Sequence, residues 1–268
     1  MSNPAFICDA GVATVGAGPV LTTVTAGANM SFTVRNSALT DKVLLTDLWR
    51  KSAHVGQARV ASPNLMPISN GIRVQTPANL ADRLLPRGFY TELTPQDTLT
   101  VSDDGTAADV DLVAIQSYYT NLPAGGMVLK NPGDIAGRAD YIFGWPVAVT
   151  SSGTAGNQGS AAITTTVDSS EANVWYALLG IETDVSVGAV GLIGVDTSQL
   201  FCGIPGNTDA YKNRDAFAQK SLETGLPCIP CFNSANKANT SIAAIDNAAS
   251  TAINATMICA RMPDNWTP

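Results

Sequence analysis

The sequence predicts an all-β protein whose two halves share one plan. Short runs rich in Val, Ile, Thr and aromatic residues are broken throughout the chain by Gly, Pro, Asn and Asp, a pattern typical of strands separated by turns. Helical periodicity is rare. In addition, the run KVLLTDLWRKSAHVGQARV (42–60) has a counterpart in NVWYALLGIETDVSVGAVGLIGV (173–195), which points to a repeated structural unit.

Taken in order, eight runs carry the strand pattern and two carry a helical one. The expected strands are MSFTVRNS (30–37), KVLLTDLW (42–49), DTLTVSDD (97–104), VDLVAIQSYY (110–119), AAITTTVDS (161–169), NVWYALLGIE (173–182), VGAVGLIGV (187–195) and NATMICARM (254–262). The expected helices are PANLADRLL (77–85) and NTDAYKNRDAFAQKS (207–221). An Asn or Thr can cap the second helix before its first turn.

The spacing of the repeated elements tests whether the similarity of the halves is more than chance. Val43 and Val174 are 131 residues apart, and Val55 and Val187 are 132 apart. The closing strands are offset by 145, so one insertion of about 13 residues (145 − 132) in the second half explains the shift. The order strand, strand, strand, short helix, strand, closing strand is thus kept twice, which we interpret as a structural duplication. The alternative, that two all-β domains share such spacing by chance, stays open.

A connection rich in Pro and Gly, TNLPAGGMVLKNPGDIAGRADY (120–141), separates the halves. We therefore expect two domains, residues 1–130 with an N-terminal arm and residues 131–268. Each has about 130 residues and about eight strand candidates, the size and strand count of a jelly roll. The predicted fold class is all-β, with two tandem eight-stranded jelly-roll β-sandwiches and short helices in loops.

Composition and charge argue against several classes of function. Charged residues make up 14% of the 268 residues, and the net charge is −7, whereas about 25% charged residues is typical of soluble domains. Because the chain has no basic run, direct binding of nucleic acid is not expected. The N-terminus lacks the cationic head of a signal peptide, and the apolar runs are shorter than the roughly 20 residues of a membrane span. Five cysteines, an odd number, favour reduced thiols in a protein assembled in the cytosol.

The repeated runs that begin at Lys42 and Asn173, with the paired closing strands that begin at Val110 and Asn254, resemble a known family. The chain resembles the double jelly-roll major capsid proteins of tailless icosahedral bacteriophages with an internal membrane. The resemblance covers nearly the whole chain and is architectural. It implies a structural viral major capsid protein whose homotrimers form pseudo-hexameric capsomers of an icosahedral shell. The implied location is the virion, with assembly in the host cytoplasm.

The resemblance also implies the partners of the protein. They are other copies of the chain, in the trimer and as lattice neighbours, and other capsid or vertex proteins. The apolar start of the chain, Pro4 to Val20, would contact internal membrane lipid or form an ordered arm under a neighbouring subunit, and both alternatives stay open. The alternative function is a virion decoration or spike protein, or a β-sandwich adhesin that binds carbohydrate.

Few residues could carry enzymatic chemistry. His54 is the one histidine of the chain and lies beside Arg50 and Lys51, so we interpret it as a solvated or interface residue. The sequence has no G-x-S-x-G nucleophile motif, no G-x-G-x-x-G fingerprint and no phosphate-binding loop. We therefore expect that the chain is not an enzyme and has no catalytic residue and no cofactor.

Cys228 and Cys231 have the C-x-x-C spacing of zinc ribbons and redox motifs. No second pair of this kind follows, so Cys202 or Cys259 would have to complete a metal site. We favour buried or loop thiols over a metal ion or a disulfide. The prolines that flank these cysteines indicate a stiff loop.

Two further groups of residues have a functional and a structural interpretation. Asp103, Asp104, Asp109 and Asp111 lie close together in the sequence and could bind calcium, but their spacing differs from the calcium loop, and solvated aspartates at a hairpin turn are favoured. No metal site is therefore predicted. The aromatic residues are interpreted as sandwich core, with sugar binding as the alternative; they are Tyr141, Phe143, Trp145, Trp175 and Tyr176.

Overall fold

A computed structural model of the chain describes nine segments of the first half and most of the second half. The described residues are 3–15, 20–23, 43–50, 56–61, 72–76, 82–83, 91–93, 100–103, 110–122 and 128–268, the last range without 156, 165–172, 186, 195–199, 207–212, 236–239 and 247. They form antiparallel sheets with few helices, so the predicted all-β class is confirmed for this part of the chain.

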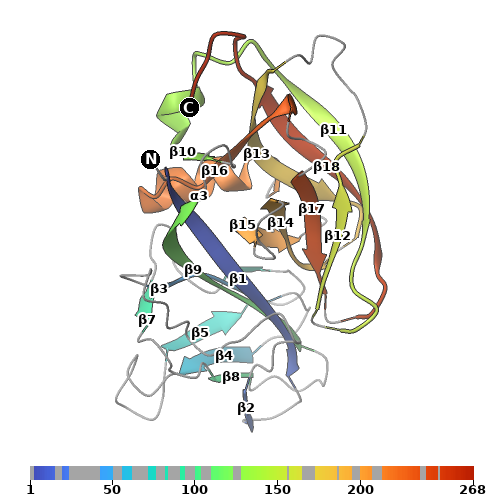
Figure 1. Cartoon of the computed structure of the whole chain (residues 1–268). Helices are drawn as coiled ribbons and strands as arrows, with labels where there is room; N and C mark the ends of the chain where they lie inside the picture. Colours follow the sequence, from blue (N-terminus) through green and yellow to red (C-terminus); the bar gives the residue numbers. More distant parts are fainter. Residues whose placement is uncertain are drawn as a thin grey trace.

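Strands of the first half form two sets of neighbours. They are β1 (Asn3–Val15), β2 (Val20–Thr23), β3 (Val43–Arg50), β4 (Gly56–Ala61), β5 (Ile72–Thr76), β6 (Asp82–Arg83), β7 (Thr91–Leu93), β8 (Thr100–Asp103) and β9 (Val110–Leu122). One set has the order β1-β9-β3-β6, with β7 also paired to β3. The other is the sheet β2-β8-β4-β5, at the bottom of Figure 1.

Strands of the second half are arranged in the same way. They are β10 (Val128–Lys130), β11 (Tyr141–Thr150), β12 (Gln158–Ala162), β13 (Trp175–Thr183), β14 (Val187–Gly194), β15 (Leu200–Gly206), β16 (Ile229–Asn233), β17 (Thr240–Ile245) and β18 (Ala252–Arg261). One sheet has the order β10-β16-β13-β18-β11, and the other set has the order β12-β17-β14-β15. The helices are α1 (Pro132–Ile135) and α3 (Ala216–Thr224), and α3 ends at Gly225, whose φ of 70° suits a helix C-terminus.

The two halves therefore repeat one strand order. If β6 and β7 are counted together, and β10 is set aside as an addition from the connection, the described residues of each half form eight strands. In each half, one set of neighbours has the order first, eighth, third, sixth, and the other has the order second, seventh, fourth, fifth. The internal duplication predicted from the sequence implies such a repeat. The boundary near residue 130 stays a prediction.

A β-bulge recurs at the same place in both halves. The third strand of the first half, β3, shifts register against β9 between Leu45 and Asp47. The third strand of the second half, β13, shifts register against β18 between Leu178 and Gly180. Because a bulge adds one residue to one strand of a pair, Thr46 and Leu179 occupy matching positions. This match aligns the halves residue by residue along β1, β9 and β3 in the first half and β11, β18 and β13 in the second.

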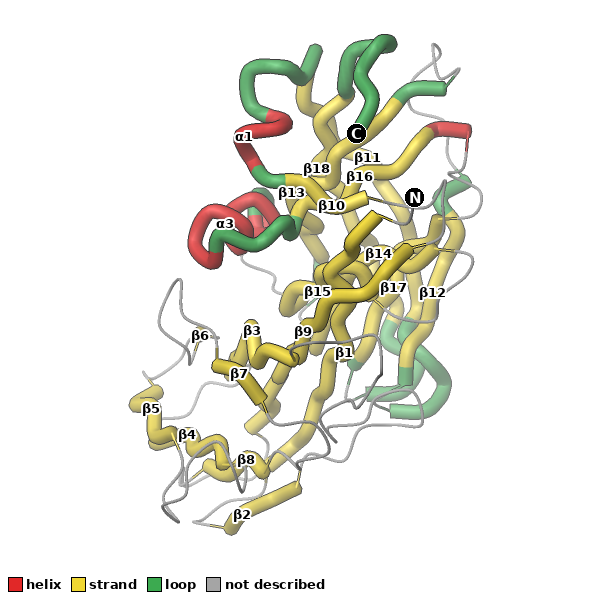
Figure 2. The backbone as a smooth tube through the Cα atoms, turned by 60° about the vertical axis from the view of Figure 1, so that its left-hand side comes forward, coloured by secondary structure: helices red, strands yellow, loops and turns green. Residues whose placement is uncertain are grey.

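One strand pair joins the halves into a continuous sheet. β15 of the second half pairs with β1 of the first half, with Ile7 opposite Phe201 and Cys8 opposite Leu200. The sheet then runs from β12 to β6 through this seam, and Figure 2 shows β15, β1 and β9 in neighbouring positions at the centre of the molecule. We call the contact between β1 and β15 the intrachain seam.

Most of the expected strands are present. The runs at 42–49, 110–119, 173–182, 187–195 and 254–262 correspond to β3, β9, β13, β14 and β18, and the run at 97–104 contains β8. The run at 161–169 overlaps β12 at residues 161 and 162, residues 163 and 164 are not in a strand, and residues 165–169 lie outside the described part of the chain. The run at 30–37 lies outside the described residues.

Three local expectations are corrected by the strand pairing. Residues 77–85 were expected to be helical, but Asp82 and Arg83 form β6 and pair with β3, since tertiary pairing overrides weak local propensity. The N-terminal residues are not an arm, because β1 pairs with β9 along its whole length. The predicted stiff loop around Cys231 is strand β16, in which Pro230 lies opposite Leu129 of β10. The helix expected at 207–221 is found as α3 at Ala216–Thr224, with 207–212 outside the described part.

Candidate functional site

The inner face of the five-stranded sheet carries an aromatic cluster. Trp145, Tyr176 and Phe232 are buried, with the Trp145 ring centroid 5.3 Å from that of Tyr176 and 6.1 Å from that of Phe232. The Tyr176 ring meets the Trp145 ring edge-on, an arrangement that aromatic pairs prefer. The interpretation of Trp145 and Tyr176 as core residues is therefore confirmed, and neither is exposed to a sugar.

The opposite face of the same sheet is covered over β16, β13 and the end of β18. Ala177, Cys231, Ala260 and Met262 belong to a buried cluster, and the partly buried residues packed against it are Ala139, Trp175, Leu179, Ala218 and Trp266. Ala218 belongs to α3, and Trp266 belongs to the C-terminal segment. The ring centroid of Trp266 lies 6.1 Å from that of Trp175. Along β11 and most of β18 the same face is open, because Gly144, Pro146 and Ala148 are exposed and Thr256 and Ile258 are partly exposed.

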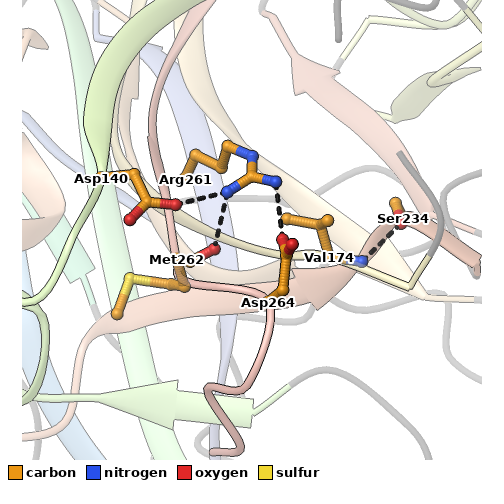
Figure 3. A network of polar contacts seen from close by, with 6 residues as sticks. All are labelled: Asp140, Val174, Ser234, Arg261, Met262 and Asp264. Carbon is orange, nitrogen blue, oxygen red and sulfur yellow. Dashed lines mark hydrogen bonds and ion pairs between the residues drawn. The ribbon is translucent and has the colours of Figure 1, made fainter. Parts of the chain in front are cut away.

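A buried arginine fixes the end of the sheet where β11 begins. The Arg261 side chain is 9% exposed, and its Nη1 donates to Asp140, which precedes β11, while its Nη2 donates to Asp264 Oδ1 at 2.7 Å. Figure 3 shows the guanidinium between these two carboxylates. The Arg261 Cζ atom also lies 5.9 Å from the centre of the Tyr141 ring. This charged cluster ties the start of β11 to the C-terminal segment.

The start of β11 is an exposed apolar strand edge. Tyr141 is 48% exposed and Ile142 is 62% exposed, and with Leu222 of α3 they are the large hydrophobic side chains that are exposed within the described part. β11 is the last strand of its sheet and has β18 as its neighbour on one side. An exposed edge strand with apolar side chains is a template for pairing with another chain. Pro146, further along β11, limits such pairing because proline has no backbone N–H.

The cysteines of the C-x-x-C pair are buried thiols. Cys228, Cys231 and Cys259 are buried. Burial raises the pKa of the Cys231 and Cys259 thiols far above the ordinary range, so both remain protonated and unreactive. Cys231 lies on strand β16, which Cys228 precedes, and the extended backbone does not bring the two sulfur atoms together for a disulfide. The favoured interpretation of buried thiols is confirmed for these three residues.

The remaining candidates from the sequence are only partly placed. Asp103 ends β8 and Asp111 lies in β9, while Asp104, Asp109 and His54 lie outside the described residues. Within the described ranges, no three His, Cys, Asp or Glu residues gather in a way that could hold a metal ion. None of the described helices is both long enough and apolar enough to cross a membrane.

Sequence reasoning missed the β11 edge, because residues 141–150 were interpreted as an aromatic core segment and not as a strand. The signal that could have found it is the alternation of Tyr141, Phe143 and Trp145 with smaller residues. Such alternation is typical of a strand with one buried face. The exposure of Tyr141 and Ile142 follows only from the position of β11 at the end of its sheet.

Comparison with known proteins gives no family for the chain. No protein-family profile matches it. No curated protein sequence matches it either.

Solved structures that resemble the chain do so at low TM-scores. The PBSX exported protein XepA has a TM-score of 0.27 and 10% identity, over 96% of this chain and 88% of its own. The major capsid protein P2 from bacteriophage PM2 has a TM-score of 0.24 and 9% identity, over 98% of this chain and 100% of its own. The Macrobrachium rosenbergii nodavirus structure has a TM-score of 0.21 and 8% identity, over 98% of each chain. Such scores establish neither the fold nor the function of this chain.

Proposed function

We propose that the chain is a structural protein of a viral shell, a major capsid protein whose homotrimers form pseudo-hexameric capsomers. Its location would be the virion, after assembly in the host cytoplasm. Its partners would be copies of itself and other capsid or vertex proteins. The proposed role involves no catalysis and no cofactor.

The observation that carries the proposal is the repeated strand order. An eight-stranded jelly roll consists of two facing four-stranded sheets linked by two Greek keys. Its strand neighbours have the orders first, eighth, third, sixth and second, seventh, fourth, fifth, and both halves of this chain follow them. The order therefore supports two tandem jelly rolls.

A doubled unit has a geometric consequence for assembly. Three copies of a chain with two similar units contain six such units, so a threefold ring can imitate sixfold symmetry and fill a hexagonal lattice. The low charged fraction of 14% also suits a protein that packs against neighbours on several sides. Neither feature requires a ligand or a reactive residue.

The experiment that tests the proposal is sedimentation of the purified full-length chain over a range of concentrations, combined with negative-stain electron microscopy. We expect trimers with triangular or hexagonal outlines about 70–80 Å wide, the size that six packed sandwiches span, and larger particles at high concentration. A chain that stays monomeric at every concentration would contradict the proposal. A discrete oligomer that binds glycans and never builds larger particles would instead favour the adhesin alternative.

A further inference from the structure

The alignment of the halves at their matching bulges identifies the counterparts of the residues in the intrachain seam. In the first half, Leu45 precedes the bulge and lies in one row with Gln116 and Asp9 across the sheet. In the second half, Leu178 precedes the bulge and lies in one row with Cys259 and Phe143. Asp9 of β1 therefore matches Phe143 of β11.

Two steps back along each strand, the alignment reaches the seam. Ile7 and Cys8 of β1, which pair with β15, match Tyr141 and Ile142 of β11. These two residues are the exposed apolar side chains of the β11 edge, at 48% and 62% exposure. The residues that form a strand contact in the first half thus have exposed apolar counterparts in the second half.

The other strand of the seam has a counterpart as well. β15 is the fifth strand of the second half, and β5 is the fifth strand of the first. β5 is the last strand of the sheet β2-β8-β4-β5 and has β4 as its neighbour on one side. Phe201 lies opposite Leu192, and Ile72 lies opposite Val60. Val60 and Leu192 are 132 residues apart, the same spacing as Val55 and Val187, so we align Val60 with Leu192. Their strand partners, Ile72 and Phe201, are then aligned as well.

We propose that a second copy of the chain occupies the β11 edge, with Ile72 of β5 in that copy opposite Tyr141, as Phe201 of β15 lies opposite Ile7 of β1 within one chain. The contact is head-to-tail, because the two edges that meet are different. Such a contact closes into a ring when the rotation between neighbours allows it. The inference rests on the proposed shell function for the number of copies in the ring, and on the repeated strand order for the identity of the edges.

The position of the Arg261 cluster agrees with this assignment. Arg261 is hydrogen-bonded to Asp140, the residue before β11, and its guanidinium lies 5.9 Å from the Tyr141 ring centre. The edge is thus held in place before a partner binds, which lowers the conformational entropy lost on association. Pro146 confines strand pairing to the start of β11, where the proposed contact lies.

A charge substitution tests whether the β11 edge is an interface. Ile142→Lys should raise the protein concentration at which half of the chain is assembled by about tenfold or more, because a charge on an exposed strand edge opposes pairing with another chain. Leu222→Lys is the matched control, since Leu222 is 64% exposed but lies on α3. Circular dichroism and thermal unfolding verify that both variants fold. If Ile142→Lys assembles like the unmodified chain, the inference is wrong.

Cysteine cross-linking tests the identity of the partner strand. The double variant Tyr141→Cys, Ile72→Cys should form intermolecular disulfides on mild oxidation, because directly opposed strand residues have Cα atoms about 4.5–5.5 Å apart. Each single variant, and Ala148→Cys combined with Ile72→Cys, should remain uncross-linked. Absence of cross-links in an assembled double variant would overturn the inference.

The pattern of cross-linked species separates this inference from the proposed function. A closed ring of three copies gives covalent products up to a trimer. A ladder of longer products would support the β5–β11 contact and contradict the trimer. If the unmodified chain forms trimers and the double variant gives no cross-link, the shell function stands and the β11 assignment fails. If the unmodified chain is monomeric by sedimentation at all concentrations, both proposals fail.

Discussion

The two halves of the chain share a strand order and a bulge but differ in the residues that fill matching positions. In the second half, the second row after the bulge carries Trp145 opposite Met257. The matching row of the first half carries Gly11 opposite Ala114. A shared topology therefore does not require the same core residues. The strand order depends on the alternation of apolar and polar residues and on the loops between strands, whereas core packing depends on the volumes of particular side chains. The difference explains why the repeat is visible in spacing and not in sequence identity.

The halves also differ in what their first strands contact. β1 is paired on both sides, by β9 and by β15, whereas β11 is paired by β18 alone among the described strands. The seam therefore satisfies the edge of one half within the chain and leaves the matching edge of the other half available.

Trp145→Ala should have the largest effect on stability. Trp145 is fully buried against Tyr176 and Phe232, and truncation of a buried Trp costs about 3–5 kcal/mol in the free energy of unfolding. Urea denaturation followed by circular dichroism measures this loss. Leu222→Ala, at a side chain that is 64% exposed, should change the free energy of unfolding by less than about 0.5 kcal/mol. Equal losses in the two variants would show that Trp145 does not anchor the second half.

Gly180→Ala should come next, because the chain that leads into α3 crosses β13 at this residue. A Cβ atom at position 180 would collide with the backbone of Asn213 and Arg214. The bulge alignment places Asp47, a residue with a Cβ, at the matching position of the first half. We expect a loss of about 1–3 kcal/mol in the free energy of unfolding, the usual cost of overpacking.

The control for Gly180 is Gly133 in α1. A Cβ atom there would meet nothing within 4 Å, so Gly133→Ala should be neutral or slightly stabilising. If Gly180→Ala behaves like Gly133→Ala in thermal unfolding, the close crossing over β13 is absent in solution.

Asp140→Asn should have a smaller effect, about 1–2 kcal/mol, because it leaves the buried Arg261 guanidinium with less charge compensation. The Asp140 side chain is 40% exposed, whereas that of Asp264 is 80% exposed. Solvent screening should therefore limit the effect of Asp264→Asn to less than about 1 kcal/mol. Chemical denaturation of the two variants in parallel measures the difference. A larger loss of stability for Asp264→Asn would mean that the Asp264 side chain is the principal partner of Arg261.

Sequence reasoning recovered the strands whose alternation is long and regular, such as β9, β13 and β18. The spacing of the repeated runs also predicted the repeated strand order, but it paired Val43 with Val174, whereas the matching bulges place Val43 against Tyr176. Sequence reasoning missed most of the other strands, including β1 and β11, which have 13 and 10 residues. The shortest of the missed strands are β2, β5, β6, β7, β10 and β16, each five residues or fewer, and so few residues carry no usable period. Their existence depends on pairing with distant partners.

The candidate site was less predictable than the fold. The buried state of Cys231 and the core role of Trp145 follow from residue type. The importance of Ile142 does not, because an isolated Ile in a β-rich sequence predicts only burial. Its exposure results from the order of strands in the sheet, with β11 last, and its relation to Cys8 required the register of six strands.

The smallest predicted effect concerns a carboxylate at the turn after β13. Asp184 Oδ1 accepts the backbone N–H of Asn254 at 2.8 Å, and its Oδ2 accepts the Asn254 side-chain amide at 2.6 Å. These bonds, the side-chain bond first, hold the pKa of Asp184 below its ordinary value of 3.8. Counted from the bulge, the matching residue of the first half is Lys51, so the first half has no acidic group at this position.

A lowered pKa in the folded state fixes the sign of the pH dependence. The carboxylate contributes stability above its unfolded pKa, and this contribution is lost as the pH falls through the lower folded pKa. Asn254→Ala removes the larger of the two causes and should raise the pKa of Asp184 towards 3.8 without restoring it fully, because the backbone donor remains. Carbon-13 NMR titration of the Asp184 carboxyl measures the shift, and Asn265→Ala in the exposed C-terminal segment should leave it unchanged. If Asn254→Ala leaves the Asp184 titration where it was, the Asn254 side chain does not stabilise the carboxylate, and the backbone donors alone lower the pKa of Asp184.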